Sequence, residues 1–133
     1  MAEKVFEAKT ELLDDVLEFV GQELEQYDCP MKVDIQLKVA IEELFVNIAH
    51  YAYGDATGEA TIQTETEPGR ISVTFIDSGT PYDPLAKEDP DITLSVEDRP
   101  IGGLGIYMVK KSMDSVEYEY KDGKNQLTIV KTW

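Results

Sequence analysis

An acidic residue stands at the end of a predicted β-strand, just before a turn that contains a glycine and prolines. Residues 70–76, RISVTFI, alternate in the way a half-buried strand does, and Asp77-Ser78-Gly79 follows directly. A plain turn accounts for the serine, the glycine and one proline, but not for a carboxylate at the inner end of an apolar strand. Such a carboxylate can accept a hydrogen bond from an exocyclic amine, and a glycine clears space for a flat ring. Asp77 and Gly79 are therefore candidates to bind a ring such as adenine.

A second candidate set is a polar stripe on the helix predicted over residues 32–53. At about 100° per residue, Glu43, Asn47 and His50 fall within roughly 60° of one another, beside an apolar arc. The side-chain oxygen of an asparagine in this stripe can coordinate a metal ion. The simpler interpretation, a stripe that faces water, is at least as well supported by the pattern alone.

The third candidate set is a glycine cluster, Gly102-Gly103-Leu104-Gly105, at the start of a predicted short helix. Glycines there allow backbone N–H groups to approach an anion closely, and the helix dipole assists. A flexible hinge is the alternative. A dinucleotide fingerprint is poorly matched, because its third glycine would fall at Met108, and a Walker A motif is absent.

The periodicity of the remaining sequence predicts the elements that position these residues. Apolar residues recur at helical spacing from Thr10, a candidate N-cap, to Tyr27. The predicted order begins with a strand at 4–10, helices at 10–27 and 32–53, and two strands at 60–67 and 70–76. A long loop at 80–100, a short helix that begins at 102, and two strands at 114–121 and 124–133 complete it. This order predicts an α+β two-layer sandwich with helices on one face of a mainly antiparallel sheet.

Length and charge bound the function. A chain of 133 residues with 42% hydrophobic content fits one domain, residues 1–133. The formal net charge of −15 repels nucleic acid and anionic membranes, so we expect neither as a partner. An anionic ligand must therefore be held by short-range contacts, such as backbone N–H groups, a helix N-terminus or a metal ion. One cysteine, Cys29, excludes an intramolecular disulfide, and the N-terminus has no apolar signal core. We expect a cytoplasmic protein.

Taken in their order along the chain, the stripe on the second helix, the stretch from Asp77 and the glycine cluster resemble the N-box and the two glycine boxes of the gyrase/histidine-kinase/MutL ATPase superfamily. Within it, the Glu-x-x-x-Asn of Glu43 to Asn47 and the Asp-x-Gly-x-Pro-x-Asp-Pro of Asp77 to Pro84 are most similar to bacterial anti-sigma factor serine/threonine kinases. The resemblance covers nearly the whole chain. It implies the Bergerat ATP-binding fold, a two-layer α/β sandwich with a mixed, mainly antiparallel sheet, and an ATP lid at about residues 80–101.

The resemblance also implies a role for each candidate. Asp77 would bind the adenine amine with Gly79 beside the base, Asn47 would hold Mg²⁺ bridging the ATP phosphates, and Glu43 would be the general base. The other implied nucleotide-binding residues are Gly103 and Gly105, whose N–H groups would contact phosphates, their neighbours Gly102 and Leu104, and Thr128, near the adenine pocket. The family commonly has a histidine four residues after the asparagine, but here that residue is Tyr51 and the histidine is His50, so the role of His50 stays open.

Two functions follow as hypotheses. The first is a kinase that phosphorylates Ser or Thr of an anti-anti-sigma (STAS-type) protein and thereby controls a sigma factor, acting as a homodimer as the resemblance implies. The second is a non-catalytic, ATP-gated binding module that sequesters a regulatory protein. The presence of Glu43 favours the kinase, because nucleotide binding alone needs no base. Histidine-kinase, gyrase-like and MutL-like activities are disfavoured, because they need further domains for which 133 residues leave no room.

Overall fold

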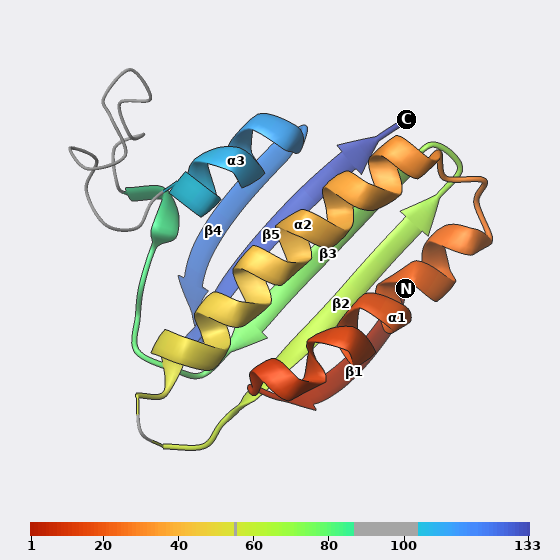
Figure 1. The fold of residues 1–133 in the computed structure, drawn as a ribbon. Helices are drawn as coiled ribbons and strands as arrows, with labels where there is room; N and C mark the ends of the chain where they lie inside the picture. Colours follow the sequence, from red (N-terminus) through yellow and green to blue (C-terminus); the bar gives the residue numbers. More distant parts are fainter. Residues whose placement is uncertain (55, 87–103) are drawn as a thin grey trace.

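The computed structural model describes residues 1–54, 56–86 and 104–133. These residues form an α+β two-layer sandwich, which confirms the predicted fold class (Figure 1). The sheet has the strand order β1-β2-β3-β5-β4, and every neighbouring pair is antiparallel, so the expectation of a mixed sheet was wrong in this respect. The strands are β1 (Ala2–Glu7), β2 (Glu59–Glu67), β3 (Arg70–Asp77), β4 (Ser115–Lys121) and β5 (Lys124–Thr132).

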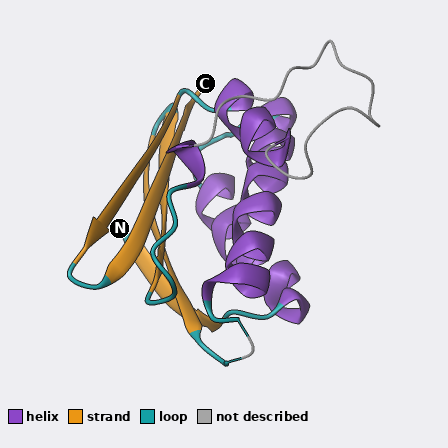
Figure 2. Cartoon of the chain, turned by 90° about the vertical axis from the view of Figure 1, so that its left-hand side faces the viewer, coloured by secondary structure: helices purple, strands orange, loops and turns teal. Residues whose placement is uncertain are grey.

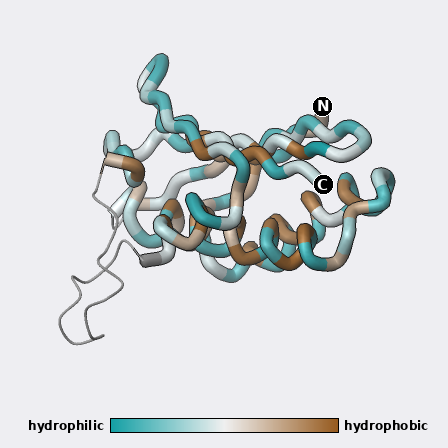
Figure 3. Tube along the Cα trace, turned by 90° about the horizontal axis from the view of Figure 1, so that it is seen from above, coloured by the Kyte–Doolittle hydropathy of each residue, from teal (hydrophilic) through white to brown (hydrophobic). Residues whose placement is uncertain are grey.

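Three helices cover one face of the sheet, with α2 between α1 and α3 (Figures 1 and 2). They are α1 (Leu13–Glu25), α2 (Met31–Asn47) and α3 (Leu104–Ser112). Hydrophobic and hydrophilic segments alternate along both layers (Figure 3), as expected for elements with one buried face. The central helix α2 contributes most to the core from the helix layer, through Val33, Leu37, Ala40, Ile41, Leu44 and Phe45.

Two helix ends differ from the prediction. Thr10 does not cap α1, because a 3₁₀ turn η1 (Thr10–Leu12) comes first and Leu12 occupies the N-cap without a side-chain bond. The second helix continues past Asn47, but as a π turn, η2 (Ile48–Ala52). In a π turn each hydrogen bond spans one residue more than in an α-helix, and such turns are frequent at functional sites. The hydrophobic pattern of the sequence did not distinguish it from continued α-helix.

The row of inward residues on β3 brings a polar pair to one end of the core. Along β3 every second residue is buried, and the series ends in Asp77. On β5 the register places Ile129 opposite Val73 and Asn125 opposite Asp77. The hairpin predicted at Asp122-Gly123 fixes the register of β5 against β4: both turn residues have positive φ, as a type I′ turn requires. Asp77 and Asn125 are therefore two buried polar residues at the end of an apolar row.

No helix of the described residues is long and apolar enough to cross a membrane.

Candidate functional site

Asp77 is nearly buried, with 7% of its surface exposed, and two groups donate to the same carboxylate oxygen. The Gly79 backbone N–H and the Asn125 side-chain amide each lie 2.9 Å from Oδ1. The described residues donate no hydrogen bond to Oδ2. A buried carboxylate that receives two donors on one oxygen is held in a fixed orientation, with the other oxygen left to accept from a ligand.

The loop after Asp77 is attached to the end of the π turn. The Thr80 N–H donates to the Ala52 carbonyl at 2.8 Å, and the Ser78 N–H donates to the Tyr53 hydroxyl at 2.9 Å. A Cβ at Gly79 would lie 2.2 Å from the Ala52 carbonyl oxygen, far inside contact distance. The space that we expected Gly79 to leave for a flat ring is thus taken on the Cβ side by the protein's own backbone.

Glu43 and Asn47 form the second part of the site. They are one turn apart on α2, half-buried, and the Asn47 amide nitrogen donates to Glu43 Oε1 at 3.0 Å. This leaves Asn47 Oδ1 as an oxygen ligand, and the described residues donate no hydrogen bond to it. The polar stripe predicted from the sequence is therefore a bonded pair rather than a row of separate solvated groups.

The first turn of α3 lies directly against this pair. A Cβ added at Gly105 would lie 2.1 Å from the Glu43 carboxyl carbon. The structure thus brings together a carboxylate, an amide oxygen and the N-terminal end of a helix, where backbone N–H groups favour an anion. Leu104 is the first residue of α3, whereas Gly102 and Gly103 lie outside the described residues, as does most of the predicted lid.

The π turn connects the two parts. Asn47, which is bonded to Glu43, directly precedes the π turn. Ala52 is the last residue of the turn, and its carbonyl accepts from the Thr80 N–H and packs against Gly79. His50 lies within the turn and is exposed, and its ring packs edge-on against Tyr51, which is 69% exposed. Among the described residues, the His50 side chain makes this ring contact and no hydrogen bond or ion pair.

Thr128 lies away from the predicted site. Its hydroxyl is 2.9 Å from that of Thr74, the residue it faces across β3 and β5, whereas Asp77 faces Asn125. Because side chains alternate between the two faces of a sheet, Thr128 is on the face away from the helices and Asp77 is on the covered face. The adenine-pocket interpretation of Thr128 was thus wrong.

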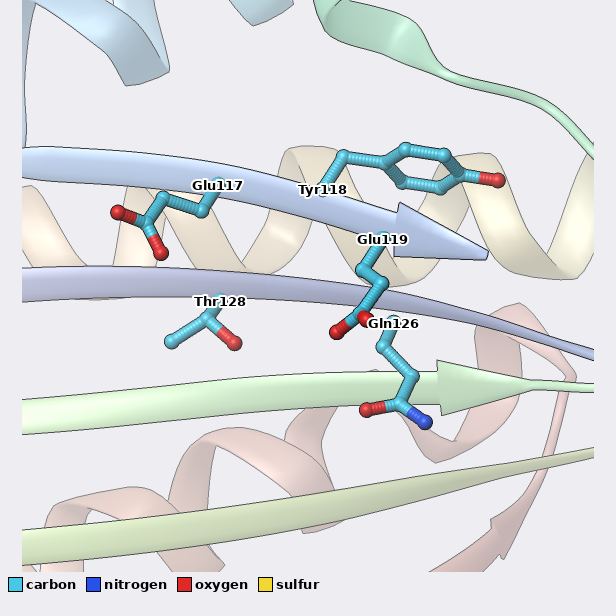
Figure 4. A pocket seen from close by; sticks show the side chains of 5 residues that line it. All are labelled: Glu117, Tyr118, Glu119, Gln126 and Thr128. Carbon is cyan, nitrogen blue, oxygen red and sulfur yellow. The ribbon is translucent and has the colours of Figure 1, made fainter. Parts of the chain in front are cut away.

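A hollow of about 500 Å³ on that open face includes Thr128 (Figure 4). Two carboxylates contribute to its lining, and the helices lie behind the strands in this view. A nucleotide phosphate would meet negative charge there, so we do not assign the nucleotide to this hollow. Its lining residues are Glu117, Tyr118, Glu119, Gln126 and Thr128.

Asn125 was missed in the sequence, although a signal for it existed. The type I′ turn at Asp122-Gly123 fixes the pairing of the last two strands, and the apolar residues Leu127 and Ile129 mark the inward positions of β5. Two residues before Leu127, the same alternation places Asn125 inward. A polar residue at an inward strand position requires a partner, and here the partner is Asp77.

The described residues contain no group of three or more His, Cys, Asp or Glu side chains arranged to hold a metal ion. Magnesium commonly keeps several waters and is held by one or two protein oxygens together with substrate phosphates. Asn47 Oδ1, next to the first turn of α3, fits that mode of binding and does not fit a metal site made by the protein alone.

Comparisons with known proteins agree with the fold. A family model described as the histidine kinase-like ATPase domain matches residues 6–131. Serine-protein kinase RsbW of Bacillus cereus (strain B4264) is 33% identical over 95 residues, which cover 68% of this chain and 59% of the relative. RsbW of Bacillus anthracis is 32% identical with the same coverage. The chain thus spans less than two thirds of the length of these relatives.

Among solved structures, the mycobacterial sensor histidine kinase MprB is similar with a TM-score of 0.55 and 16% identity, covering 98% of this chain and 97% of that one. The Acinetobacter baumannii histidine kinase AdeS is similar with a TM-score of 0.51 and 16% identity, covering 99% of this chain and 68% of that one. At this identity the likeness shows the fold alone.

Proposed function

This chain belongs to the histidine kinase-like ATPase domain family, and we propose that it is an ATP-dependent kinase that phosphorylates serine or threonine of a partner protein. The observation that carries the proposal is the position of Glu43. Its carboxylate accepts a hydrogen bond from Asn47 and lies against the first turn of α3. The proposed general base, the proposed metal ligand Asn47 and a helix end suited to an anion are therefore adjacent. The relatives named serine-protein kinases support the same reaction class.

We assign the binding residues in order along the nucleotide, from the adenine ring to the phosphates. Asp77 accepts a hydrogen bond from the adenine amine, since Oδ1 is already bonded within the protein and Oδ2 is left. The backbone around Gly105, with Gly102, Gly103 and Leu104, donates to the phosphates, and Asn47 holds Mg²⁺. When bound, Mg²⁺ neutralises negative charge on the phosphates during transfer. Gly79 fixes the loop after Asp77 by docking on Ala52.

In the proposed reaction the substrate hydroxyl approaches the γ-phosphorus in line with the leaving ADP. Glu43 accepts the hydroxyl proton as the new P–O bond forms and the bond to ADP breaks. A carboxylate is a weak base for an alcohol, so Glu43 contributes mainly by its position. The Asn47 amide holds Oε1 in place, and the nearby helix N-terminus stabilises the charge on the transferred group.

The proposed partner is an anti-anti-sigma protein of the STAS type, with a sigma factor as the protein ultimately controlled. The proposal includes a cytoplasmic location and a homodimer, the second taken from the family resemblance. With 27 acidic and 12 basic residues, the chain attracts partners that present a basic face.

Transfer of labelled phosphate tests the proposal. The purified protein is incubated with γ-labelled Mg-ATP and an extract of its source cell, beside Glu43→Gln and a matched control, Glu42→Gln, whose side chain is exposed on the same helix. We expect a small protein labelled on serine or threonine with the wild type and with Glu42→Gln, and no label with Glu43→Gln, although all three bind ATP. ATP binding without transfer by the wild type would instead support a nucleotide-gated module that sequesters its partner.

A further inference from the structure

We propose that Asn125 is a positioning residue that orients the Asp77 carboxylate and thereby sets the preference of the site for a 6-amino purine over a 6-oxo purine. The inference rests on the proposed ATP-binding function and deepens it. It concerns a residue that touches Asp77 rather than the reacting atoms. The observations that carry it are the burial of Asn125 and the set of hydrogen bonds that its side chain makes.

Asn125, on β5, joins the end of β3 and the loop after it to β4. Only 7% of its surface is exposed, and it faces Asp77 across the β3–β5 pair. Its amide nitrogen donates to Asp77 Oδ1 at 2.9 Å, to the Thr80 carbonyl at 3.0 Å and, at the 3.5 Å limit, to the Gly79 carbonyl. Its carbonyl oxygen accepts from the Tyr82 N–H at 3.1 Å and from the Tyr118 hydroxyl.

The chemical identity of these partners permits one orientation of the amide. The groups around Nδ2 are a carboxylate and two backbone carbonyls, all of which accept hydrogen bonds. The groups around Oδ1 are a backbone N–H and a hydroxyl, which donate. A rotated amide would place an oxygen among three acceptors. The side chain therefore offers Asp77 an N–H donor and cannot exchange it for an acceptor.

Tyr118 on β4 completes this network. Burial raises the pKa of the Tyr118 hydroxyl, while a hydrogen bond with the Tyr82 backbone acts in the opposite direction. A tyrosine with a raised pKa stays protonated at neutral pH, so the hydroxyl remains a donor to Asn125 Oδ1. The chain of donors runs from Tyr118 through Asn125 to Asp77 and crosses three neighbouring strands, β4, β5 and β3.

Selection of the purine base depends on which oxygen of the Asp77 carboxylate is left to accept a hydrogen bond. The Asn125 amide and the Gly79 N–H both occupy Oδ1, which leaves Oδ2 as a hydrogen-bond acceptor. The 6-amine of adenine can donate to that oxygen. A 6-oxo purine presents a carbonyl there, and two acceptors repel each other. Without Asn125 only the Gly79 N–H holds Oδ1, so the orientation of the carboxylate is less fixed and the discrimination between the two bases weakens.

The test compares Mg-ATP with Mg-ITP, which carries a 6-oxo base, by calorimetric titration of the full-length chain. Asn125→Ala is expected to bind ATP about 10- to 100-fold more weakly, the range for one hydrogen bond to a charged group, while ITP affinity changes much less. The matched control is Gln126→Ala, next along β5 and on the opposite face of the sheet. It is expected to keep the wild-type ratio of the two affinities.

Two further variants separate positioning from simple structural support. Tyr118→Phe removes one hydroxyl and keeps the ring, and it is expected to lower the ATP-to-ITP affinity ratio less than Asn125→Ala does. In an Asp77→Asn background, Asn125→Ala is expected to change the ratio no further, because the two residues act through one contact. If Asn125→Ala does not fold, Tyr118→Phe in both backgrounds decides the question.

The inference is overturned if Asn125→Ala weakens both nucleotides equally, or if the ratio is unchanged in Asn125→Ala and in Tyr118→Phe. A general structural role predicts the first of these results, together with a lower melting temperature. Failure of the proposed function looks different, since the wild-type chain would then bind neither nucleotide. A wild-type preference for ATP that survives in all variants contradicts the role of Asn125 and leaves the ATP-binding function intact.

Discussion

At the scale of single residues, two glycines of the candidate site lie where a side chain would collide, and the collisions differ in kind. A Cβ at Gly79 would meet the backbone carbonyl of Ala52, which cannot move without distorting the π turn. A Cβ at Gly105 would meet the carboxylate of Glu43, the free end of a flexible side chain. The first glycine is needed for the structure of the loop, whereas the second is needed to let Glu43 stand against α3.

Gly105→Ala is therefore expected to separate stability from activity. Alanine favours helix formation over glycine by about 0.5–1 kcal/mol, so urea unfolding should show a stability close to that of the wild type. The displaced carboxylate is expected to lower phosphoryl transfer by about 100-fold, the cost of misplacing a catalytic group by an ångström. Transfer assays with labelled ATP measure this.

Gly21→Ala is the matched control, because Gly21 lies in α1 and its added Cβ meets nothing within 4 Å. It should keep full activity and gain slightly in stability. Wild-type transfer rates in Gly105→Ala would contradict the placement of Glu43 as the base.

At the scale of elements, the sequence predicted most of the fold because its local signals are strong. Both hairpins follow from their turns, and the long helices follow from apolar spacing. The candidate site was less predictable. The π turn leaves no change of period in the sequence, and the contact of Gly79 with Ala52 depends on how that turn ends. Thr128 was assigned from the family resemblance, whereas strand parity counted from Asp122-Gly123 would have selected Asn125.

One element contact anchors the helix that carries Gly105. The Asp114 carboxylate, just after α3, accepts hydrogen bonds from the Thr132 N–H at 2.6 Å and from its hydroxyl at 2.9 Å. The Lys131 ammonium donates to the carbonyl of Ser112, the last residue of α3, at 2.7 Å. The C-terminal end of α3 is thus fixed to the end of β5. We expect this anchor to maintain the distance between α3 and α2.

Asp114→Asn tests the anchor through pH. Hydrogen bonds from the Thr132 backbone and side chain hold the pKa of Asp114 below its usual value, and slight burial opposes them. A lowered pKa in the folded state means that the stabilisation is complete above the unfolded value and is lost as pH falls through the folded value. At pH 7 the variant should be less stable by up to about 1 kcal/mol, because the carboxylate is largely exposed.

Urea unfolding from pH 7 to pH 3 measures this difference, which should shrink at the acid end. Asp122→Asn removes the same charge from an exposed turn and serves as the control. A gap between Asp114→Asn and the wild type that is constant over the whole pH range would show that the carboxylate charge is not involved.

At the scale of the whole molecule, the charge is far from balanced. The chain has 27 acidic and 12 basic residues, and within the described ranges two ion pairs, Lys9–Glu7 and Lys38–Asp34, place an acidic side chain beside a basic one. Unscreened like charges repel one another more in the compact state than in the extended chain. An anionic nucleotide must also enter against this field. The short-range donors of the site therefore act against a long-range repulsion.

Added salt is expected to stabilise the nucleotide-free protein. Between about 0.02 M and 0.2 M NaCl the screening length falls to below about 10 Å, which weakens the repulsion among surface carboxylates. The melting temperature should rise over this range, as measured by circular dichroism at pH 7. At a pH near 4.2, where the net charge approaches zero, the same salt step should have a smaller effect. A melting temperature that falls with salt at pH 7 would mean that favourable ion pairs outweigh the net repulsion.

The π turn at the end of α2 also constrains how this chain tolerates changes of length. Helix ends that lead into surface loops usually accept insertions and deletions. Here, deleting one residue between Asn47 and Ala52 would allow plain α-helix, but it would turn the Ala52 carbonyl by about 100° and shift it by about 1.5 Å. Thr80 would lose its acceptor and Gly79 its docking surface. The spacing between Asn47 and Ala52 is thus a fixed length, and homologous chains should keep it even where the side chains in between vary.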